Sequence, residues 1–168
     1  MKTVIIGFSG SGKSTLAKTI GEKQGVPVLY LDKVHWLSGW REREREDEVK
    51  IVGDFLDRND SWVIDGNYNS LHFERRLEEA DQIIFMDFNR FACLSRAVKR
   101  RVEYNGKARF SITEGCPEKI DFEFFTWLMF KGRTKKRRKR YLDAVNKYKN
   151  KSLVIKNQKQ LDEFYRSL

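Results

Sequence analysis

The feature that most constrains this chain is a glycine-rich loop near its amino terminus, GFSGSGKS at 7–14. It satisfies the pattern G-x-x-x-x-G-K-[ST] and follows an apolar, β-branched run at 2–6. An amphipathic segment begins near Lys13, so the loop joins a predicted strand to a predicted helix. This arrangement points backbone N–H groups and the positive end of a helix dipole at one place. We therefore expect the loop, called the phosphate loop below, to bind phosphate groups.

The residue types of the phosphate loop fit that role. Glycines let backbone N–H groups turn inward without Cβ clashes. Lys13 can reach the β- and γ-phosphates of a nucleotide, and the Ser14 hydroxyl can ligate Mg²⁺. The expected binding residues are Gly7, Ser9, Gly10, Ser11, Gly12, Lys13 and Ser14.

The rest of the chain alternates between apolar strands and helices. Strands are predicted at 2–6, 28–31, 61–65, 82–87 and 152–156. Helices are predicted from 13 to about 25 and at about 43–57, 70–79, 90–104, 118–130 and 134–148, and after Asn157. Apolar strands that alternate with helices indicate a parallel sheet covered on both faces. We expect a single α/β domain over 1–168: a three-layer P-loop fold with a five-stranded parallel sheet.

A phosphate loop also needs a carboxylate near Mg²⁺, at the end of a neighbouring strand. Asp65 in SWVIDGN and Asp87 in IIFMDF both end predicted strands. Gly66 follows Asp65 and lets the chain turn sharply away from a ligand, which favours Asp65. Either aspartate could instead serve as a turn residue or a helix cap.

The charge balance bears on the kind of ligand. Lysine and arginine number 34 and acidic residues 24, a formal net charge of +10, which favours polyanions such as nucleotides or nucleic acid. The apolar run before Gly7 is too short for a signal peptide or a membrane span. Cys93 and Cys116 lack metal-ligand spacing. We expect a cytoplasmic protein with reduced thiols and no membrane partner.

Eight cations stand in ten positions at 131–140, KGRTKKRRKR, called the basic run below. A helix that begins near Thr134 would place three of them at its positive end, each opposing the dipole by about 0.3–1 kcal/mol. An anion is therefore expected beside the run. A nucleotide would meet this need, and so would nucleic acid, which would bind with steep salt dependence. No base-reading fold accompanies the run, so nucleic acid is the less favoured partner.

Several motifs resemble a known group. The phosphate loop, Asp65-Gly66 and SRAVKRRV at 95–102 resemble the adenylate-kinase group of small P-loop kinases. LDKVHWLSGW at 31–40, DGNY at 65–68 and EGCPEK at 114–119 resemble bacterial DNA topology modulation (FlaR-type) proteins, nearly end to end. The resemblance implies a kinase that uses ATP and Mg²⁺ and closes a helical lid, at about 100–140, over the nucleotide.

The same resemblance assigns residues to ATP. It adds Thr15 to the phosphate loop, stacks Arg96 on the adenine and places Arg100 on the phosphates. Arg96 and Arg100 share a helix face at i and i+4, and guanidinium groups both stack on rings and bind phosphate. Spacing alone is equally consistent with a solvated basic face. In the lid, Arg133 and Arg138 are the candidates to reach the γ-phosphate in the transition state.

The acceptor side is expected near Asp32, at the end of the second predicted strand. Carboxylates at this position in related kinases bind or deprotonate the acceptor hydroxyl. Trp36 and Trp40 follow, and their indoles could stack on a base or sugar or instead anchor the loop in the core. The adenylate-kinase group continues after Asp65-Gly66 with Phe-Pro-Arg, whose arginine holds AMP. Here Asn67 and Tyr68 follow, which argues against AMP and places these two residues, with Asp65, among the acceptor contacts.

The favoured hypothesis is an ATP-binding kinase that transfers the γ-phosphate to a small molecule, nucleotide-like or nucleoside-like. Lys13, Asp32, Arg100 and Arg138 are its predicted catalytic residues. The alternative is a nucleotide-regulated, non-specific DNA-binding protein that affects DNA topology. The sequence leaves the oligomeric state open.

Overall fold

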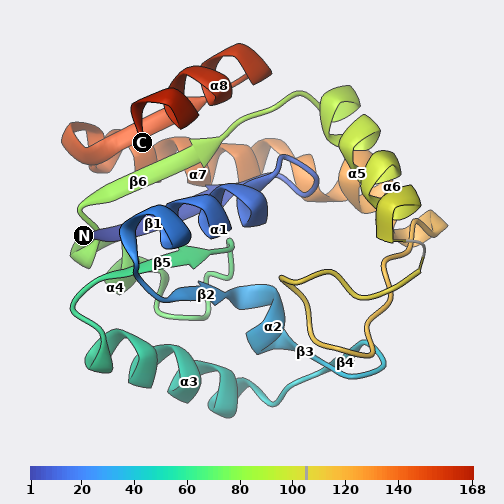
Figure 1. Cartoon of the computed structure of the whole chain (residues 1–168), viewed down its shortest axis with the longest axis horizontal. Helices are drawn as coiled ribbons and strands as arrows, with labels where there is room; N and C mark the ends of the chain where they lie inside the picture. The colour runs from blue at the N-terminus through green and yellow to red at the C-terminus, as the bar shows by residue number, and fades with distance from the viewer. Residues whose placement is uncertain (105) are drawn as a thin grey trace.

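The centre of the fold is a five-stranded parallel sheet with the strand order β2-β5-β1-β6-β7 (Figure 1). The computed structural model describes residues 1–104 and 106–168. The strands are β1 (Lys2–Gly7), β2 (Val28–Tyr30), β5 (Trp62–Asp65), β6 (Gln82–Met86) and β7 (Ser152–Ile155). They confirm all five strands predicted from the sequence.

Helices cover both faces of this sheet, which confirms the predicted three-layer α/β architecture. In Figure 1, α1 (Lys13–Gln24) lies in front of the strands, and α4 (Phe73–Glu79) and α7 (Lys135–Lys147) lie behind them. The central strands are apolar on both sides, as this layering requires, and Val4, Ile5 and Ile6 of β1 are fully buried. None of the described helices is both long enough and apolar enough to cross a membrane.

Four further helices follow the predicted order: α3 (Arg45–Arg58), α5 (Arg90–Tyr104), α6 (Phe122–Met129) and α8 (Gln158–Ser167). The structure adds α2 (Leu31–His35), which was not predicted, and the short 3-10 turns η1 (Lys131–Arg133) and η2 (Lys149–Lys151). Helix α6 begins at Phe122 rather than near 118, because the Asp121 carboxylate accepts the N–H of Phe124 as its cap. Asn157 caps α8 as predicted. Asn105, within the expected lid span, lies outside the described residues.

The chain between β2 and α3 differs from the prediction. It forms α2 and then a small antiparallel hairpin of β3 (Trp36–Leu37) and β4 (Arg41–Glu42). Strands of two residues are too short to produce a detectable periodicity, so the sequence predicted only a loop here. The hairpin and the segment 106–121 lie beside each other on the same side of the sheet's carboxyl end (Figure 1).

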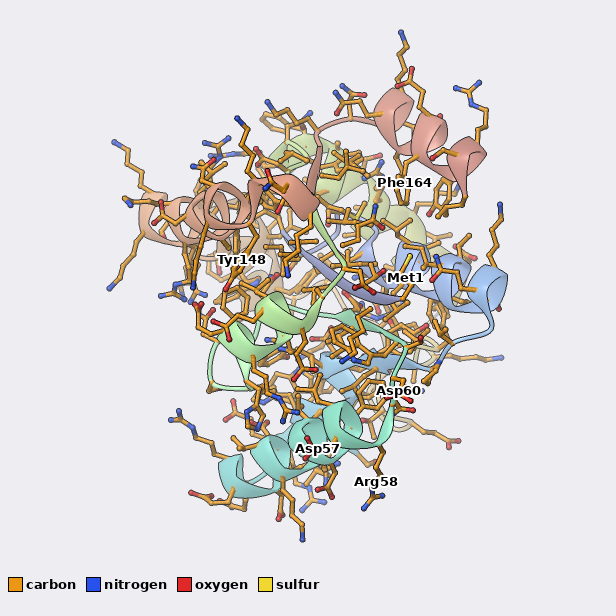
Figure 2. The ribbon with its side chains drawn as sticks, turned by 90° about the vertical axis from the view of Figure 1, so that its left-hand side faces the viewer. Met1, Asp57, Arg58, Asp60, Tyr148 and Phe164 are labelled. Atoms are coloured by element: carbon orange, nitrogen blue, oxygen red, sulfur yellow. The ribbon has the colours of Figure 1, made fainter. Side chains whose placement is uncertain are left out.

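The topology places the binding residues at one edge. From β1 the chain crosses to β2 on one side, and the later strands β6 and β7 lie on the other. Ligands of open parallel sheets bind at such a switch point, outside the carboxyl ends of the strands. β1, β2 and β5 all end there, so the phosphate loop, Asp32 and Asp65 meet. Figure 2 shows the opposite, amino-terminal edge of the sheet, with Met1 near the middle of the view and Asp57 and Arg58 at the end of α3 (Arg45–Arg58) below it.

Candidate active site

The phosphate loop has the backbone shape that its glycines predict. Gly10 and Gly12 have φ values of 77° and 97°, in the left-handed region. Gly12 caps α1 without any side-chain hydrogen bond, so the first N–H groups of the helix remain free for an anion. Gly10 also lies so close to α5 that a Cβ would come 2.6 Å from the Cys93 carbonyl oxygen.

Gly10→Ala is expected to destabilise the fold more than Gly25→Ala. Gly25 ends α1 with φ 65° and open space around it, so alanine costs only the left-handed conformation, about 1–2 kcal/mol. Gly10→Ala adds a clash with backbone and should cost at least about 3 kcal/mol. Thermal unfolding measures both, at about 2–4 °C for each kcal/mol. Equal shifts for the two variants would contradict the close packing of the loop on α5.

Lys13 lies folded across the phosphate loop. Its Nζ donates to the Phe8 carbonyl oxygen at 3.0 Å. Burial lowers the pKa of Lys13, and the nearby carboxylates of Asp65 and Asp32 partly oppose this effect. The ammonium group can thus exchange a loop carbonyl for a phosphate oxygen, in a setting where charge interactions are stronger than in water.

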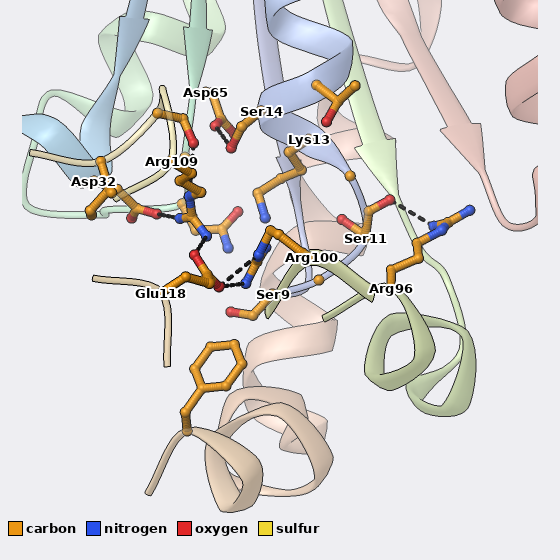
Figure 3. A pocket seen from close by; sticks show the side chains of 18 of the residues that line it. Ser9, Ser11, Lys13, Ser14, Asp32, Asp65, Arg96, Arg100, Arg109 and Glu118 are labelled. Carbon is orange, nitrogen blue, oxygen red and sulfur yellow. Dashed lines mark hydrogen bonds and ion pairs between the residues drawn. The ribbon is translucent and has the colours of Figure 1, made fainter. Parts of the chain in front are cut away.

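Asp65 and Ser14 form the arrangement expected of a magnesium site. The Ser14 hydroxyl donates to Asp65 Oδ2 at 2.5 Å (Figure 3). Asp65 Oδ1 is buried and has no hydrogen-bond partner among the described residues. Burial raises the pKa of Asp65 against the opposing influence of Lys13 and Ser14. An unpaired carboxylate oxygen beside a serine hydroxyl fits a hard cation such as Mg²⁺. Asp87, the other candidate, instead pairs with Arg138 at 2.8 Å.

We predict that Asp65→Asn removes the Mg²⁺ dependence of ATP binding, whereas Asp87→Asn preserves it. In calorimetric titrations, the gain in ATP affinity on adding Mg²⁺ should fall by about 10-fold or more for Asp65→Asn. Asp87→Asn is the matched control, because Asp87 also ends a strand beside β1 but is paired with Arg138. A loss of the Mg²⁺ effect in Asp87→Asn alone would reverse the assignment.

The loop after β5 supports the phosphate loop. Asn67 Oδ1 accepts the Gly7 N–H at 2.9 Å, and Asn67 Nδ2 donates to the Gly7 carbonyl at 2.7 Å. Both polar atoms of Asn67 are thus engaged by backbone, so this residue clamps the phosphate loop. Asn67 also lines the cavity, and its contact with an acceptor stays a prediction. The fully buried Arg76 fixes the same segment by donating to three carbonyls within 66–71.

Asp32 is the centre of a charged network at the cavity (Figure 3). The Tyr68 hydroxyl donates to Oδ1 at 2.9 Å, and Arg109 Nη2 donates to Oδ2 at 2.8 Å. Arg109 also pairs with Glu118 at 3.3 Å, and Arg100 Nε donates to Glu118 at 2.7 Å. Burial and the Asp32 charge raise the pKa of Tyr68, so it remains a hydrogen-bond donor. Arg100, expected on the phosphates, is held by Glu118 at the cavity wall.

The predicted tryptophans belong to an aromatic row that lines the cavity. Ring centroids are separated by 5.0 Å for Tyr68 and His35, 4.5 Å for His35 and Trp36, and 5.4 Å for Trp36 and Trp40. Both indoles are half-buried and line the cavity with Asp32. This placement favours ligand stacking over the core-anchor alternative.

The arginines that were predicted to contact ATP differ in whether they line the cavity. Arg96 lines the cavity, donates to the Ser11 carbonyl at 2.8 Å and stacks 3.9 Å over the Phe88 ring. Arg133 and Arg138 do not line the cavity among the described residues: Arg133 is bound to the carbonyls of 88 and 128, and Arg138 is bound to Asp87.

The basic run reaches the cavity through other side chains. Lys131 and Arg137 line it, and the Arg137 guanidinium lies 4.7 Å over Trp127. The Trp127 Nε1 donates to Ser9 of the phosphate loop at 3.1 Å. Arg137 therefore lines the cavity where Arg138 does not, because adjacent residues of α7 point about 100° apart, and the position of Arg138 gives no support to its predicted role at the γ-phosphate. A run of eight cations gives no sequence signal for which of them faces inward.

The phosphate loop, Asp65, Asp32 and the aromatic row line one cavity, which has a volume of about 1400 Å³. Small-molecule sites are commonly about 300–1,000 Å³, so this cavity can hold two ligands of nucleotide size. The phosphate loop, including Thr15, forms one wall, and Asp32 with the aromatic row forms another.

Sequence reasoning missed several further residues of the site. Arg109 bonds Asp32, 77 positions away, and Glu118 bonds Arg100, 18 positions away. Arg76 donates to carbonyls only 5 to 10 positions before it in the chain. Glu48 stands in a charged stretch that reads as a solvated face, yet it is buried and bonds His35 at 2.6 Å.

The sheet order together with the phosphate loop defines a P-loop fold of the α/β class. No protein-family model matches the chain, and a search of curated protein sequences found no match. A deoxyadenosine kinase from M. mycoides, solved with dCMP and a flexible dCDP bound, aligns with a TM-score of 0.47. It is 14% identical over 92% of this chain and 90% of that one. A shikimate kinase from Aquifex aeolicus aligns with a TM-score of 0.42 and 19% identity over 61% of this chain and 77% of that one.

Proposed function

We propose that this protein is an ATP-dependent kinase that transfers the γ-phosphate to a small molecule, nucleotide-like or nucleoside-like. One observation carries the proposal: the phosphate loop with Lys13 and the carboxylate of Asp32 line the same cavity. Asp32 lies close enough to Lys13 to influence its pKa. A phosphate donor and a hydroxyl acceptor can therefore meet between these two groups.

The chain's own residues account for the transfer. Loop N–H groups and Lys13 hold the phosphate chain, and Arg96 and Arg137 supply positive charge at the cavity wall. The acceptor oxygen forms a bond to the γ-phosphorus, the bond to the β–γ bridging oxygen breaks, and ADP leaves. Asp32 accepts the proton of the acceptor hydroxyl. Mg²⁺, which Ser14 and Asp65 would hold, neutralises charge on the β- and γ-phosphates when bound.

The alternative, a nucleotide-regulated DNA-binding protein, has less support. Several cations of the basic run are already engaged: Lys131 and Arg137 line the cavity, and Arg138 and Lys139 pair with aspartates, whereas Lys135 and Lys136 are exposed. A run divided in this way offers a smaller surface to a DNA backbone. Gel-shift titration against salt tests the alternative, and strong binding at low salt would favour it.

The direct test of the kinase is a screen of nucleosides, nucleotides and sugars with γ-labelled ATP and Mg²⁺. We expect one class of compound to acquire the label. Calorimetry with ATP and Mg²⁺ is run in parallel. Absence of both ATP binding and label transfer would overturn the proposal.

A further inference from the structure

The wall of the cavity around the phosphate loop is rich in available cations. This wall, called the donor half, comprises the phosphate loop, Arg96 and Lys99 of α5, and the inward-facing residues of the basic run. Among the described residues, Lys13 donates only to a backbone carbonyl, Arg137 rests on an indole ring, and neither forms a salt bridge. Such groups can turn to a phosphate chain without leaving a carboxylate unpaired.

The wall around Asp32 has the opposite character. This wall, called the acceptor half, consists of Asp32, the aromatic row, Arg100 of α5 and the facing parts of β4 and 109–121. Its three cations are each already paired with a carboxylate. Arg109 pairs with Asp32 and Glu118, Arg100 pairs with Glu118, and Lys119 pairs with Asp121 at 2.8 Å. With Glu42, four carboxylates face three cations across this half.

This charge balance bears on the acceptor. A phosphate monoester carries about −1.5 to −2 at neutral pH. To bind in the acceptor half it would have to separate Arg109 from its partners. Asp32 would then lie beside a second anion without its guanidinium, and Glu118, which is only 5% exposed, would keep Arg100 as its one cation. An uncharged acceptor leaves the ion pairs with Glu118 in place. Its hydroxyl group only has to replace Arg109 at one oxygen of Asp32.

The uncharged features of the acceptor half indicate what it binds. The aromatic row presents ring edges and faces on which a flat ring can stack. Trp40 lines the cavity, and its indole Nε1 is buried and has no partner among the described residues. Asp32 accepts a hydroxyl group.

We propose that the acceptor carries no phosphate: the acceptor half takes an uncharged, hydroxyl-bearing compound with a flat ring, a nucleoside, and rejects the corresponding monophosphate. This inference rests on the proposed kinase function. It narrows the acceptor from nucleotide-like or nucleoside-like compounds to nucleosides, on the basis of the ion pairs around Asp32 and Glu118.

The test compares each nucleoside with its 5′-monophosphate as acceptor, using labelled ATP and the wild-type protein. We expect kcat/KM to favour the nucleoside by at least about 100-fold. Quenching of tryptophan fluorescence, titrated with each compound in the absence of ATP, gives an independent measure of binding and should favour the nucleoside as well.

A variant that removes one carboxylate tests whether the ion pairs cause the preference for the nucleoside. Glu118→Gln frees Arg100 and Arg109 to bind an anion, so the preference for the nucleoside should fall by about 10-fold or more. Glu114→Gln is the matched control, because Glu114 is exposed in the same segment and should leave the preference unchanged. If Glu118→Gln does not fold, the wild-type comparison decides alone.

The outcomes separate the two proposals. A monophosphate that is phosphorylated as well as its nucleoside overturns the acceptor class and leaves the kinase standing. ATP binding without transfer to any nucleoside also overturns the acceptor class. Failure of ATP to bind overturns the kinase itself.

Discussion

Lys13→Ala is expected to lower the rate of phosphate transfer by about 100-fold to 1,000-fold, the usual cost of removing one preorganised donor from a transition state. The ammonium group is the cation of the phosphate loop itself, and among the described residues it donates only to a loop carbonyl. The measurement is kcat for label transfer to the acceptor found in the screen, with ATP affinity followed by calorimetry.

Lys23→Ala provides the control for Lys13→Ala. Lys23 lies on the same helix, α1, but is exposed near its carboxyl end, so its loss should leave transfer unchanged. Full transfer by Lys13→Ala would reject the role given to the phosphate loop. Equal losses in both variants would point to general damage to α1 instead.

Asp32→Asn is expected to reduce transfer by about 100-fold to 10,000-fold while ATP affinity is retained. The amide keeps an oxygen that can accept from Tyr68 or Arg109, so the local hydrogen bonding is largely preserved. The substitution removes the carboxylate that accepts the proton of the acceptor hydroxyl. Steady-state kinetics and ATP calorimetry on the same preparation separate these two effects.

The control for Asp32→Asn is Asp60→Asn. Asp60 is exposed between α3 and β5, at the amino-terminal edge of the sheet (Figure 2), far from the cavity. It should leave both measurements unchanged. A variant Asp32→Asn that transfers phosphate at the wild-type rate would remove Asp32 from the mechanism.

The predictions from sequence succeeded where a local pattern carries the information. The phosphate loop, the five strands and the N-cap Asn157 each depend on residues within a few positions of one another. Asp65 could be favoured over Asp87 because a glycine follows it, and the structure brings Asp65 to Ser14.

The rest of the site arises from contacts that no local pattern specifies. Arg109 lies 77 positions from its partner Asp32, and Asn67 lies 60 positions from the glycine it clamps. The basic run illustrates the same limit, because its charge predicts an anion but not the helical phase that turns Arg137 inward and Arg138 outward.

The pairing of Arg109 with Asp32 bears on the hydrolysis of ATP when ATP is bound without an acceptor. Tyr68 and Arg109 each donate to one oxygen of Asp32. In the proposed kinase, a molecule that is to be activated by Asp32 must displace the Arg109 guanidinium, which a bound acceptor can do with its own binding energy and a single water molecule cannot. We therefore expect slow hydrolysis of ATP in the absence of an acceptor.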